Sequence, residues 1–409
     1  MFYDRKLILM ILLLISIYLS TPLFSEINFA QIYYSPSISI NGDVIAFSCF
    51  SNAMSEPNKY WHPYIYKTNR LYRLDDNTNN YSSINTYISE VQISPDGTHV
   101  FFNEYANTVQ NCYSYNINSH RLSFLQNKCM INNRRIIIGD TFIPLIYSIH
   151  HNNYVVFHNN NVSHSKSNSF MNGSYISIVN MDTDKIIFDK CIPFLINIVA
   201  VSPDGDIIYY IANSFNNSII LYKYNRKTNN IKSIVPIVKN KMLLLKSGID
   251  NINVSNNGRY ITFNAFAENL LTKETHRQVF IYDVRYKSTK LISIGTDNMQ
   301  ANDDSGSVNI NISADGRYIC YDSSATNIVK NNYVDYGIYI YDTKTGITKF
   351  VSYDQFGKPI YNKENKILNI RFAMSKNAKE LLYIVNNNIY MRNLKTAESI
   401  LLSDSRIMF

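Results

Sequence analysis

The chain has 409 residues, of which 46% are hydrophobic and 17% are charged, with 33 tyrosines, 21 phenylalanines and one tryptophan. This composition is typical of an ordered, β-rich protein and excludes a largely disordered chain. The net charge of +8 comes from 39 basic and 31 acidic residues scattered along the sequence. Because the basic residues form no block interleaved with aromatic residues, we expect no nucleic-acid binding.

The first 25 residues have the pattern of a secretory signal peptide. Arg5 and Lys6 precede an apolar run over residues 7–19, and Pro22 and Ser25 follow it. The run is shorter than the ~20 residues that span a bilayer comfortably. We therefore expect cleavage after Ser25, a periplasmic or secreted mature protein and no membrane span after cleavage. An N-terminal membrane anchor is the alternative.

A nine-residue pattern, a polar turn followed by a hydrophobic strand, occurs seven times along the rest of the chain. Its copies begin at residues 39, 94, 149, 202, 255, 313 and 375. The seventh residue of each copy is aliphatic, and the ninth is always aromatic: Phe47, Phe102, Phe157, Tyr210, Phe263, Tyr321 and Tyr383. The spacing of two indicates a strand. A period of this size indicates a repeat architecture.

The turn of the pattern has a position that favours glycine. Five copies have Gly42, Gly97, Gly205, Gly258 and Gly316 there, and glycine adopts a positive φ without a Cβ clash. Asn152 is the next-best residue for this conformation. The last copy has Ala378, which is a poor choice, so we expect the seventh turn to be altered.

Each copy continues into a second hydrophobic strand and a short outer strand, and a further short strand precedes each turn. Four antiparallel strands that repeat every ~40 to 60 residues make a propeller blade. We therefore predict an all-β, seven-bladed β-propeller of four-stranded antiparallel blades, in one domain over residues 26–409. A six-bladed propeller with a degenerate extra unit is the alternative. Residues 27–34 are expected to add to or cap the edge of the first blade.

The run from Asn298 to Ser352 resembles the bacterial TolB-type, WD40-like propeller repeat. It has a SADGRY turn and strand, a long polar loop, a YIYD strand and a TGITKFVS outer strand. TolB has an additional N-terminal domain, for which the first copy at residue 39 leaves no room, and its propeller has six blades. The resemblance therefore implies the propeller, but neither the complete TolB protein nor its role.

The sequence lacks the motifs of several enzyme classes. It has no G-x-S-x-G, no phosphate-binding glycine loop and no H-E-x-x-H. One histidine cluster offers metal ligands, but its members are expected at different ends of one hairpin: His150, His151, His158 and His164. Four aspartates are alternative calcium ligands, although they are better explained as acceptors for loop backbone donors: Asp303, Asp304, Asp322 and Asp335. We predict no metal and no cofactor.

Recognition is expected on the face where the longest loops gather. These loops join the second and third strands of a blade, and we place them at residues 51–63, 158–173, 264–278 and 322–337. Trp61 is the only tryptophan; it is either an interface residue or packed under a neighbouring loop. The candidate binding residues on this face are Tyr60, Trp61, His62, Arg277 and Tyr336.

These patterns predict an exported, noncatalytic, monomeric propeller that binds a protein partner in the periplasm or cell envelope. The alternative is a propeller enzyme of the lyase or lactonase type with a metal-dependent site in the axial channel. The fold alone does not decide between them, because propellers host both functions.

Overall fold

The computed structural model describes the chain over the following residues: 29–31, 36–51, 60–68, 70–74, 86–94, 96–106, 109–124, 148–149, 154–162, 173–180, 185–192, 196–202, 205–213, 219–234, 243–269, 272–296, 298–330, 336–360, 370–385 and 388–402. Strands are the only regular elements in these residues. The described part therefore includes no helix that is long and apolar enough to cross a membrane. The proposed signal peptide lies outside it.

The described strands form seven antiparallel sheets in chain order. The first sheet has five strands: β1 (Phe29–Gln31), β2 (Ser37–Ile38), β3 (Val44–Ser51), β4 (Tyr60–Lys67) and β5 (Arg70–Arg73). The second has four: β6 (Thr86–Ile93), β7 (His99–Ala106), β8 (Val109–Asn116) and β9 (Arg121–Phe124). The third has β10 (Ser148–Ile149), β11 (Tyr154–Val162), β12 (Gly173–Asn180) and β13 (Lys185–Ile192).

The other four sheets repeat the same order. The fourth consists of β14 (Ile196–Val201), β15 (Ile207–Asn213), β16 (Ile219–Asn225) and β17 (Asn230–Ile234). The fifth consists of β18 (Leu243–Val254), β19 (Tyr260–Asn269), β20 (Thr275–Asp283) and β21 (Ser288–Leu291). The sixth consists of β22 (Ser305–Ile312), β23 (Tyr318–Ser323), β24 (Gly337–Asp342) and β25 (Ile347–Phe350). The seventh consists of β26 (Arg371–Met374), β27 (Glu380–Val385), β28 (Asn388–Asn393) and β29 (Ser399–Leu401).

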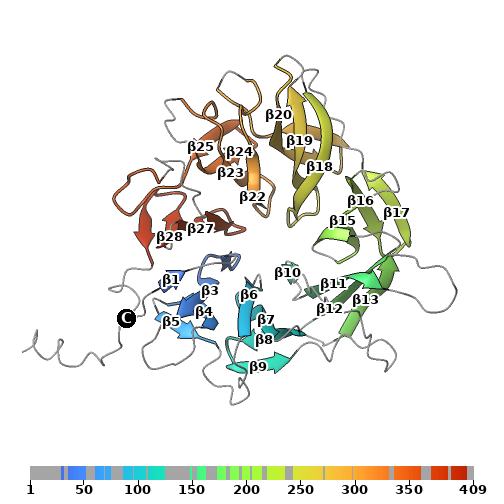
Figure 1. Cartoon of the computed structure of the whole chain (residues 1–409), viewed down its shortest axis with the longest axis vertical. Helices are drawn as coiled ribbons and strands as arrows, with labels where there is room; N and C mark the ends of the chain where they lie inside the picture. The colour runs from blue at the N-terminus through green and yellow to red at the C-terminus, as the bar shows by residue number, and fades with distance from the viewer. Residues whose placement is uncertain are drawn as a thin grey trace, which may run out of the picture.

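The sheets stand around a common centre, with the first strand of a sheet inside and the fourth at the rim, as β6 and β9 or β22 and β25 show (Figure 1). This arrangement confirms the predicted all-β propeller. One sheet corresponds to each copy of the nine-residue pattern. β1 pairs with β3 beside β2, so residues 29–31 add to the edge of the first sheet as expected.

The repeated aromatic residue stacks on the next strand of its own sheet. Six of the seven copies show such a pair, with ring centroids 5.3 to 6.1 Å apart: Phe47–Tyr64, Phe102–Tyr113, Tyr210–Tyr222, Phe263–Phe280, Tyr321–Tyr339 and Tyr383–Tyr390. In the third sheet Phe157 lies opposite Ser177 instead. Cross-strand aromatic pairs stabilise a sheet, and this explains why the column is aromatic.

In six of the seven copies a serine closes the turn that precedes the second strand, whereas the third copy has Ile149 at this position. In the sixth sheet the Ser313 hydroxyl accepts a hydrogen bond from the backbone N–H of Tyr318 at 2.9 Å, and Gly316 N–H donates to Ser313 O at 3.0 Å. Ala378 has φ +54°, and its N–H donates to Ser375 O at 2.8 Å. The expectation of an altered seventh turn is therefore wrong, because the same hydrogen bonds hold alanine in the left-handed conformation.

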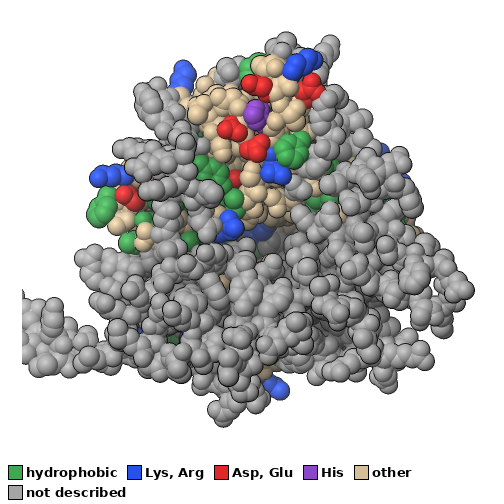
Figure 2. Space-filling model, viewed as in Figure 1, with side chains coloured by type: hydrophobic (Ala, Val, Ile, Leu, Met, Phe, Trp, Pro, Cys, Tyr) green, Lys and Arg blue, Asp and Glu red, His purple; other side chains and the backbone are tan. Residues whose placement is uncertain are grey.

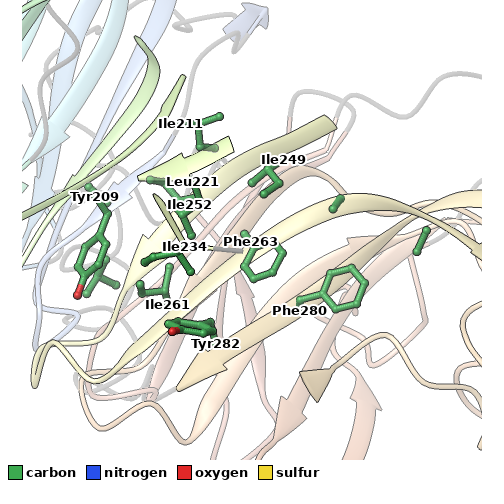
Figure 3. Close-up of a cluster of buried hydrophobic side chains, with 14 of the residues drawn as sticks. Tyr209, Ile211, Leu221, Ile234, Ile249, Ile252, Ile261, Phe263, Phe280 and Tyr282 are labelled. Atoms are coloured by element: carbon green, nitrogen blue, oxygen red, sulfur yellow. The ribbon is translucent and has the colours of Figure 1, made fainter. Parts of the chain in front are cut away.

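The core consists of layers between neighbouring sheets. Figure 3 shows one of them, where side chains of the fourth and fifth sheets interdigitate. Ile211 and Leu221 contribute from one side, and Ile261, Phe263 and Phe280 from the other, all fully buried. Similar buried clusters join the first and second sheets, the fifth and sixth, the sixth and seventh, and the seventh and first. Close packing of this kind makes these described interfaces rigid.

The ring closes by side-chain packing between its first and last sheets. Every strand of the first sheet comes from residues 29–73, and every strand of the seventh from residues 371–401. One buried cluster joins the two sheets: Ile45, Phe47, Tyr64, Tyr66, Leu382, Ile384, Ile389 and Leu402. The Asn377 N–H also donates to Ile40 O at 3.3 Å. No strand is exchanged between the two sheets in the described residues.

Candidate functional site

The two ends of the strands define two faces of the ring. The turn face carries the serine turns and the hairpins between third and fourth strands, such as the one between β24 and β25. The long-loop face carries the connections between second and third strands and those between consecutive sheets. Antiparallel order places these connections at opposite ends of the strands.

Several predicted loop residues on the long-loop face belong to strands. Tyr60, Trp61 and His62 lie in β4, and Arg277 lies in β20. In the fifth sheet β19 and β20 pair as far as Glu268 and Thr275, which shortens the predicted 264–278 loop to a few residues. Cross-strand pairing of side chains continues into the predicted loop residues, and therefore β4 and β20 begin earlier than the sequence predicted.

Three of the candidate binding residues occupy the same place in three different sheets. Trp61, Arg277 and Tyr336 each precede by three residues an aromatic of the stacked column, namely Tyr64, Phe280 and Tyr339. Arg277 and Tyr336 belong to the neighbouring fifth and sixth sheets. Trp61 belongs to the first sheet, and the seventh sheet separates it from the sixth. His62 is buried with 5% of its surface exposed.

Arg277 is fixed at the junction of the fifth and sixth sheets. Its guanidinium carbon lies 4.7 Å from the centre of the Phe266 ring, and its backbone N–H donates to Asp304 Oδ1 at 2.7 Å. A guanidinium above an aromatic face is a favourable cation–π arrangement. Arg277 is therefore half-buried and held from two sides.

Three side chains beside Arg277 form what we call the acidic corner: His276, Asp303 and Asp304. His276 Nδ1 lies 3.7 Å from Asp303 Oδ1 and 4.0 Å from Asp304 Oδ1. Figure 2 shows a histidine among acidic side chains on the outer surface above the fifth and sixth sheets. One imidazole nitrogen and two carboxylate oxygens within 4.8 Å of one another could hold a divalent cation.

Asp322 has a different role from the acidic corner. Its carboxylate is fully buried and accepts three backbone hydrogen bonds, from Ser307, Val308 and Asn309, at 3.0 to 3.2 Å. Tyr336 donates its hydroxyl proton to Asp322 Oδ2 at 3.0 Å. Burial raises the pKa of both the Asp322 carboxyl and the Tyr336 phenol. Asp322 thus satisfies loop donors, as predicted for this group of aspartates.

The Asp322 contacts depend on an irregular start of β22. The pairing of β22 with β23 shifts register between Ser305 and Ile310, and Gly306 adopts φ +72°. A Cβ at Gly306 would lie 2.8 Å from a Val279 methyl carbon, and the Gly306 carbonyl accepts a hydrogen bond from Asn264 Nδ2 at 2.5 Å. The bulge turns three N–H groups toward one carboxylate, as bulges near functional sites often do.

An amide network fixes the loop that follows β23. Asn302 and Thr326 exchange two hydrogen bonds of 2.9 Å, and Asn327 Nδ2 donates to Gln300 O at 3.0 Å. Ala325 and Ile328 are buried beneath this network. The connection into β22 and the loop after β23 therefore form one packed surface on the long-loop face.

A hydrophobic side chain projects from the same face on the hairpin that follows β25. Phe356 has 78% of its surface exposed. The Asp354 carboxylate accepts backbone hydrogen bonds from Phe356 and Lys358 at 2.9 and 2.8 Å. Tyr353 pairs with Pro359 across the hairpin. The exposed ring is thus presented on a tip that hydrogen bonds hold in place.

Other candidates from the sequence lie outside the described residues. His150, His151, His164 and Asp335 are among them, and the side chain of His158 in β11 is not described either. Sequence analysis did not single out His276. His276 directly precedes Arg277 in the sequence, but its approach to Asp303 depends on how two adjacent sheets pack.

No protein-family model matches the chain, and no curated protein matches it. Solved structures do match. The β-propeller domain of the trilobed protease from Pyrococcus furiosus, which has an open velcro topology, matches with a TM-score of 0.54 and 12% identity over 91% of this chain and 96% of that domain. Oligogalacturonate lyase in complex with manganese matches with a TM-score of 0.50 and 10% identity over 87% of this chain and 85% of the lyase.

A peptidase shows the same fold in a longer chain. The acylaminoacyl peptidase of Pyrococcus horikoshii matches with a TM-score of 0.53 and 12% identity over 92% of this chain, which spans 53% of the peptidase. At such identities the matches show a shared propeller fold and nothing about activity. These matches support the propeller fold, but they do not distinguish a TolB-type propeller from other propellers.

Proposed function

We propose that the protein is an exported, noncatalytic propeller that binds a protein partner in the periplasm or cell envelope through its long-loop face. The observation that carries the proposal is the packed surface of the fifth and sixth sheets. There the amide network holds polar side chains in fixed positions, and backbone hydrogen bonds to Asp354 fix the hairpin tip that carries the exposed Phe356. Fixed side chains lose little conformational entropy on binding.

Phe356 supplies an apolar contact on the long-loop face, and the acidic corner supplies charge elsewhere on the same face. Exposed aromatic side chains are enriched at interface hot spots. The TolB-type pattern in residues 298–352 and the N-terminal apolar run motivate the envelope location. The long-loop face of a TolB-like propeller at the envelope would then meet a protein that is exposed in the same compartment.

The test is chemical crosslinking of the tagged protein in its own cell envelope, followed by affinity capture and identification of partners. Phe356→Ala should reduce capture of the partner several-fold. The matched control is Tyr286→Ala, since Tyr286 is 67% exposed on the turn face and its loss should leave capture unchanged. A partner lost equally in both variants, or no partner with the unaltered protein, would overturn the proposal.

The acidic corner favours a second candidate, a metal-dependent propeller enzyme of the lyase or lactonase type, with its metal site on the outer surface and not in the axial channel where the sequence predicted it. His276, Asp303 and Asp304 would hold the cation, and the cation would supply Lewis-acid activation of a substrate oxygen. Metal analysis of the purified protein and titration with Mn²⁺ and Zn²⁺ test this candidate. Stoichiometric binding that His276→Ala and Asp303→Asn both abolish would favour the enzyme, and no binding above that of a surface carboxylate would exclude this site.

A further inference from the structure

Lys376 extends from the turn of the seventh sheet along the inner wall of the ring. Its ammonium nitrogen lies 3.2 Å from Asn253 Oδ1 in β18 and 3.2 Å from the carbonyl oxygen of Ile312 in β22. The lysine therefore contacts the fifth and sixth sheets from the seventh. The sixth sheet lies between the fifth and the seventh. A side chain of the seventh sheet can therefore contact the fifth only at the inner edge of the sheets, next to the ring axis.

The serine turns of these sheets lie side by side around that axis. Asn256 N–H donates to Ala314 O at 2.9 Å, Ala314 N–H donates to Lys376 O at 2.7 Å, and Asn377 N–H donates to Ile40 O. This chain of backbone hydrogen bonds runs from the fifth sheet to the first. Lys376 thus lies at the mouth of the ring on the turn face, on the opposite side from the acidic corner.

The charge of Lys376 has no counterpart among the described residues. Both of its acceptors are neutral oxygens, and no described carboxylate forms an ion pair with it. The residue as a whole is half-buried, and its ammonium group is the more deeply buried part. Burial without an anionic partner lowers the pKa of Lys376 to about 8, because desolvation disfavours the ammonium form.

We propose that Lys376 is the recognition point of an anion site at the turn-face mouth of the ring, and that its ligand carries a carboxylate. An anion placed there would supply the missing countercharge. Two of the three ammonium protons are directed at Asn253 and Ile312, which leaves one for a single ligand oxygen. One remaining donor suits a monodentate carboxylate better than a phosphate, which is usually held by several N–H groups.

Two sources provide this chemistry: a small organic acid and an acidic peptide segment. Citrate and a short polyglutamate peptide serve as the two probes. Trace acetylation of the intact protein, quantified for each lysine by mass spectrometry, reports the protection of Lys376. The reference is Lys379, which is exposed in the same turn.

A bound carboxylate favours the ammonium form and shields it, so one or both probes should slow acetylation of Lys376 by about tenfold, equivalent to one pKa unit, and leave Lys379 unchanged. Calorimetric binding of the effective probe should be lost in Lys376→Met and retained in Lys379→Met. Lys376→Arg, which keeps the charge, should retain part of the binding. Thermal unfolding confirms that each variant folds.

Protection by the peptide alone would identify an acidic segment as the ligand, and protection by citrate would identify a small acid. Two results would overturn the site. One is equal acetylation of Lys376 with and without both probes; the other is unchanged binding in Lys376→Met. Because Phe356 lies on the opposite face, loss of the proposed partner in Phe356→Ala would not affect these results.

Discussion

Left-handed backbone positions determine how the turns respond to substitution. Gly316 has φ +78°, and a Cβ there would collide with the ring of Tyr260 in the preceding sheet. Gly357 has nearly the same φ, +77°, and a Cβ there would meet no atom within 4 Å. The two positions therefore separate backbone strain from a steric clash between sheets.

Gly316→Val should lower the free energy of unfolding by more than about 1 to 3 kcal/mol, the range expected for a strained backbone alone. The matched Gly357→Val should stay within that range. Chemical denaturation of both variants measures the difference. Equal losses in the free energy of unfolding would show that the Tyr260 ring moves away from the new side chain without a measurable energetic penalty.

Ala378→Gly should stabilise the protein by about 0.5 to 1 kcal/mol. The substitution removes the backbone strain of a non-glycine residue at φ +54°. The free energy of this strain is larger than the free-energy cost of the conformational entropy that glycine adds to the unfolded chain. Comparison of unfolding midpoints in denaturant measures the gain. A lower midpoint would indicate that Ala378 packing against the sheet matters more than its backbone conformation.

At the level of elements, one ionic contact links the serine turn to the end of the third strand. Arg259 pairs with Asp283 and Arg317 with Asp342, at 2.7 and 2.8 Å. In the fourth sheet the signs are reversed, since Asp206 stands at the place of the turn arginine and pairs with Arg226 and Lys227, which directly follow the third strand. Retention of the contact with opposite signs indicates that the pair, and not either residue alone, stabilises the hairpin.

The Arg317 pair gives a prediction for acid pH. Its hydrogen bonds hold the pKa of Asp342 at about 2, below the ordinary 3.8. A lowered folded-state pKa adds stability above pH 3.8, and the addition is lost as the pH falls toward 2. Asp342→Asn should therefore be destabilising near pH 6, with a difference from the unaltered protein that shrinks below pH 4. A difference that does not change between pH 6 and 3 would contradict this assignment.

Asp322 should be far more sensitive than its tyrosine partner. Asp322→Ala leaves three backbone N–H groups and the Tyr336 hydroxyl without their acceptor, at about 1 to 3 kcal/mol for each buried group that finds no water. Tyr336→Phe removes one hydrogen bond, worth about 1 kcal/mol. Denaturant unfolding compares the two. A Tyr336→Phe loss as large as that of Asp322→Ala would show that the tyrosine, and not the bulge of β22, organises this region.

For the whole molecule, local patterns predicted the sheets because each copy of the pattern contains the strands of its own sheet. The aromatic column and the serine could be found in the sequence because their partners lie within the same copy. Contacts between residues of different copies could not be predicted from the sequence. The approach of His276 to Asp303 and the reach of Lys376 to Asn253 depend on the angle between neighbouring sheets. Ala378 was misjudged because propensity describes an isolated turn, whereas flanking hydrogen bonds hold this one.

Closure of the ring between the first and seventh sheets is the feature on which both proposed faces depend. A Cβ at Gly42 would lie 3.1 Å from Glu380 Cβ, and a Cβ at Gly97 would lie 3.3 Å from Ser39 Cβ. Both separations lie just below the range of about 3.5 to 4.5 Å that disulfides show between Cβ atoms, so a small shift of the backbone allows the bond. The first pair spans the closure, and the second joins the consecutive first and second sheets.

The most direct measurement is therefore disulfide formation in the double variant Gly42→Cys/Glu380→Cys, with Ser39→Cys/Gly97→Cys as the matched control. Mild oxidation followed by peptide mass spectrometry should find an intramolecular link in both variants. If the control pair links while positions 42 and 380 remain reduced, or link only between molecules, the first sheet does not pack on the seventh and the closed ring is wrong.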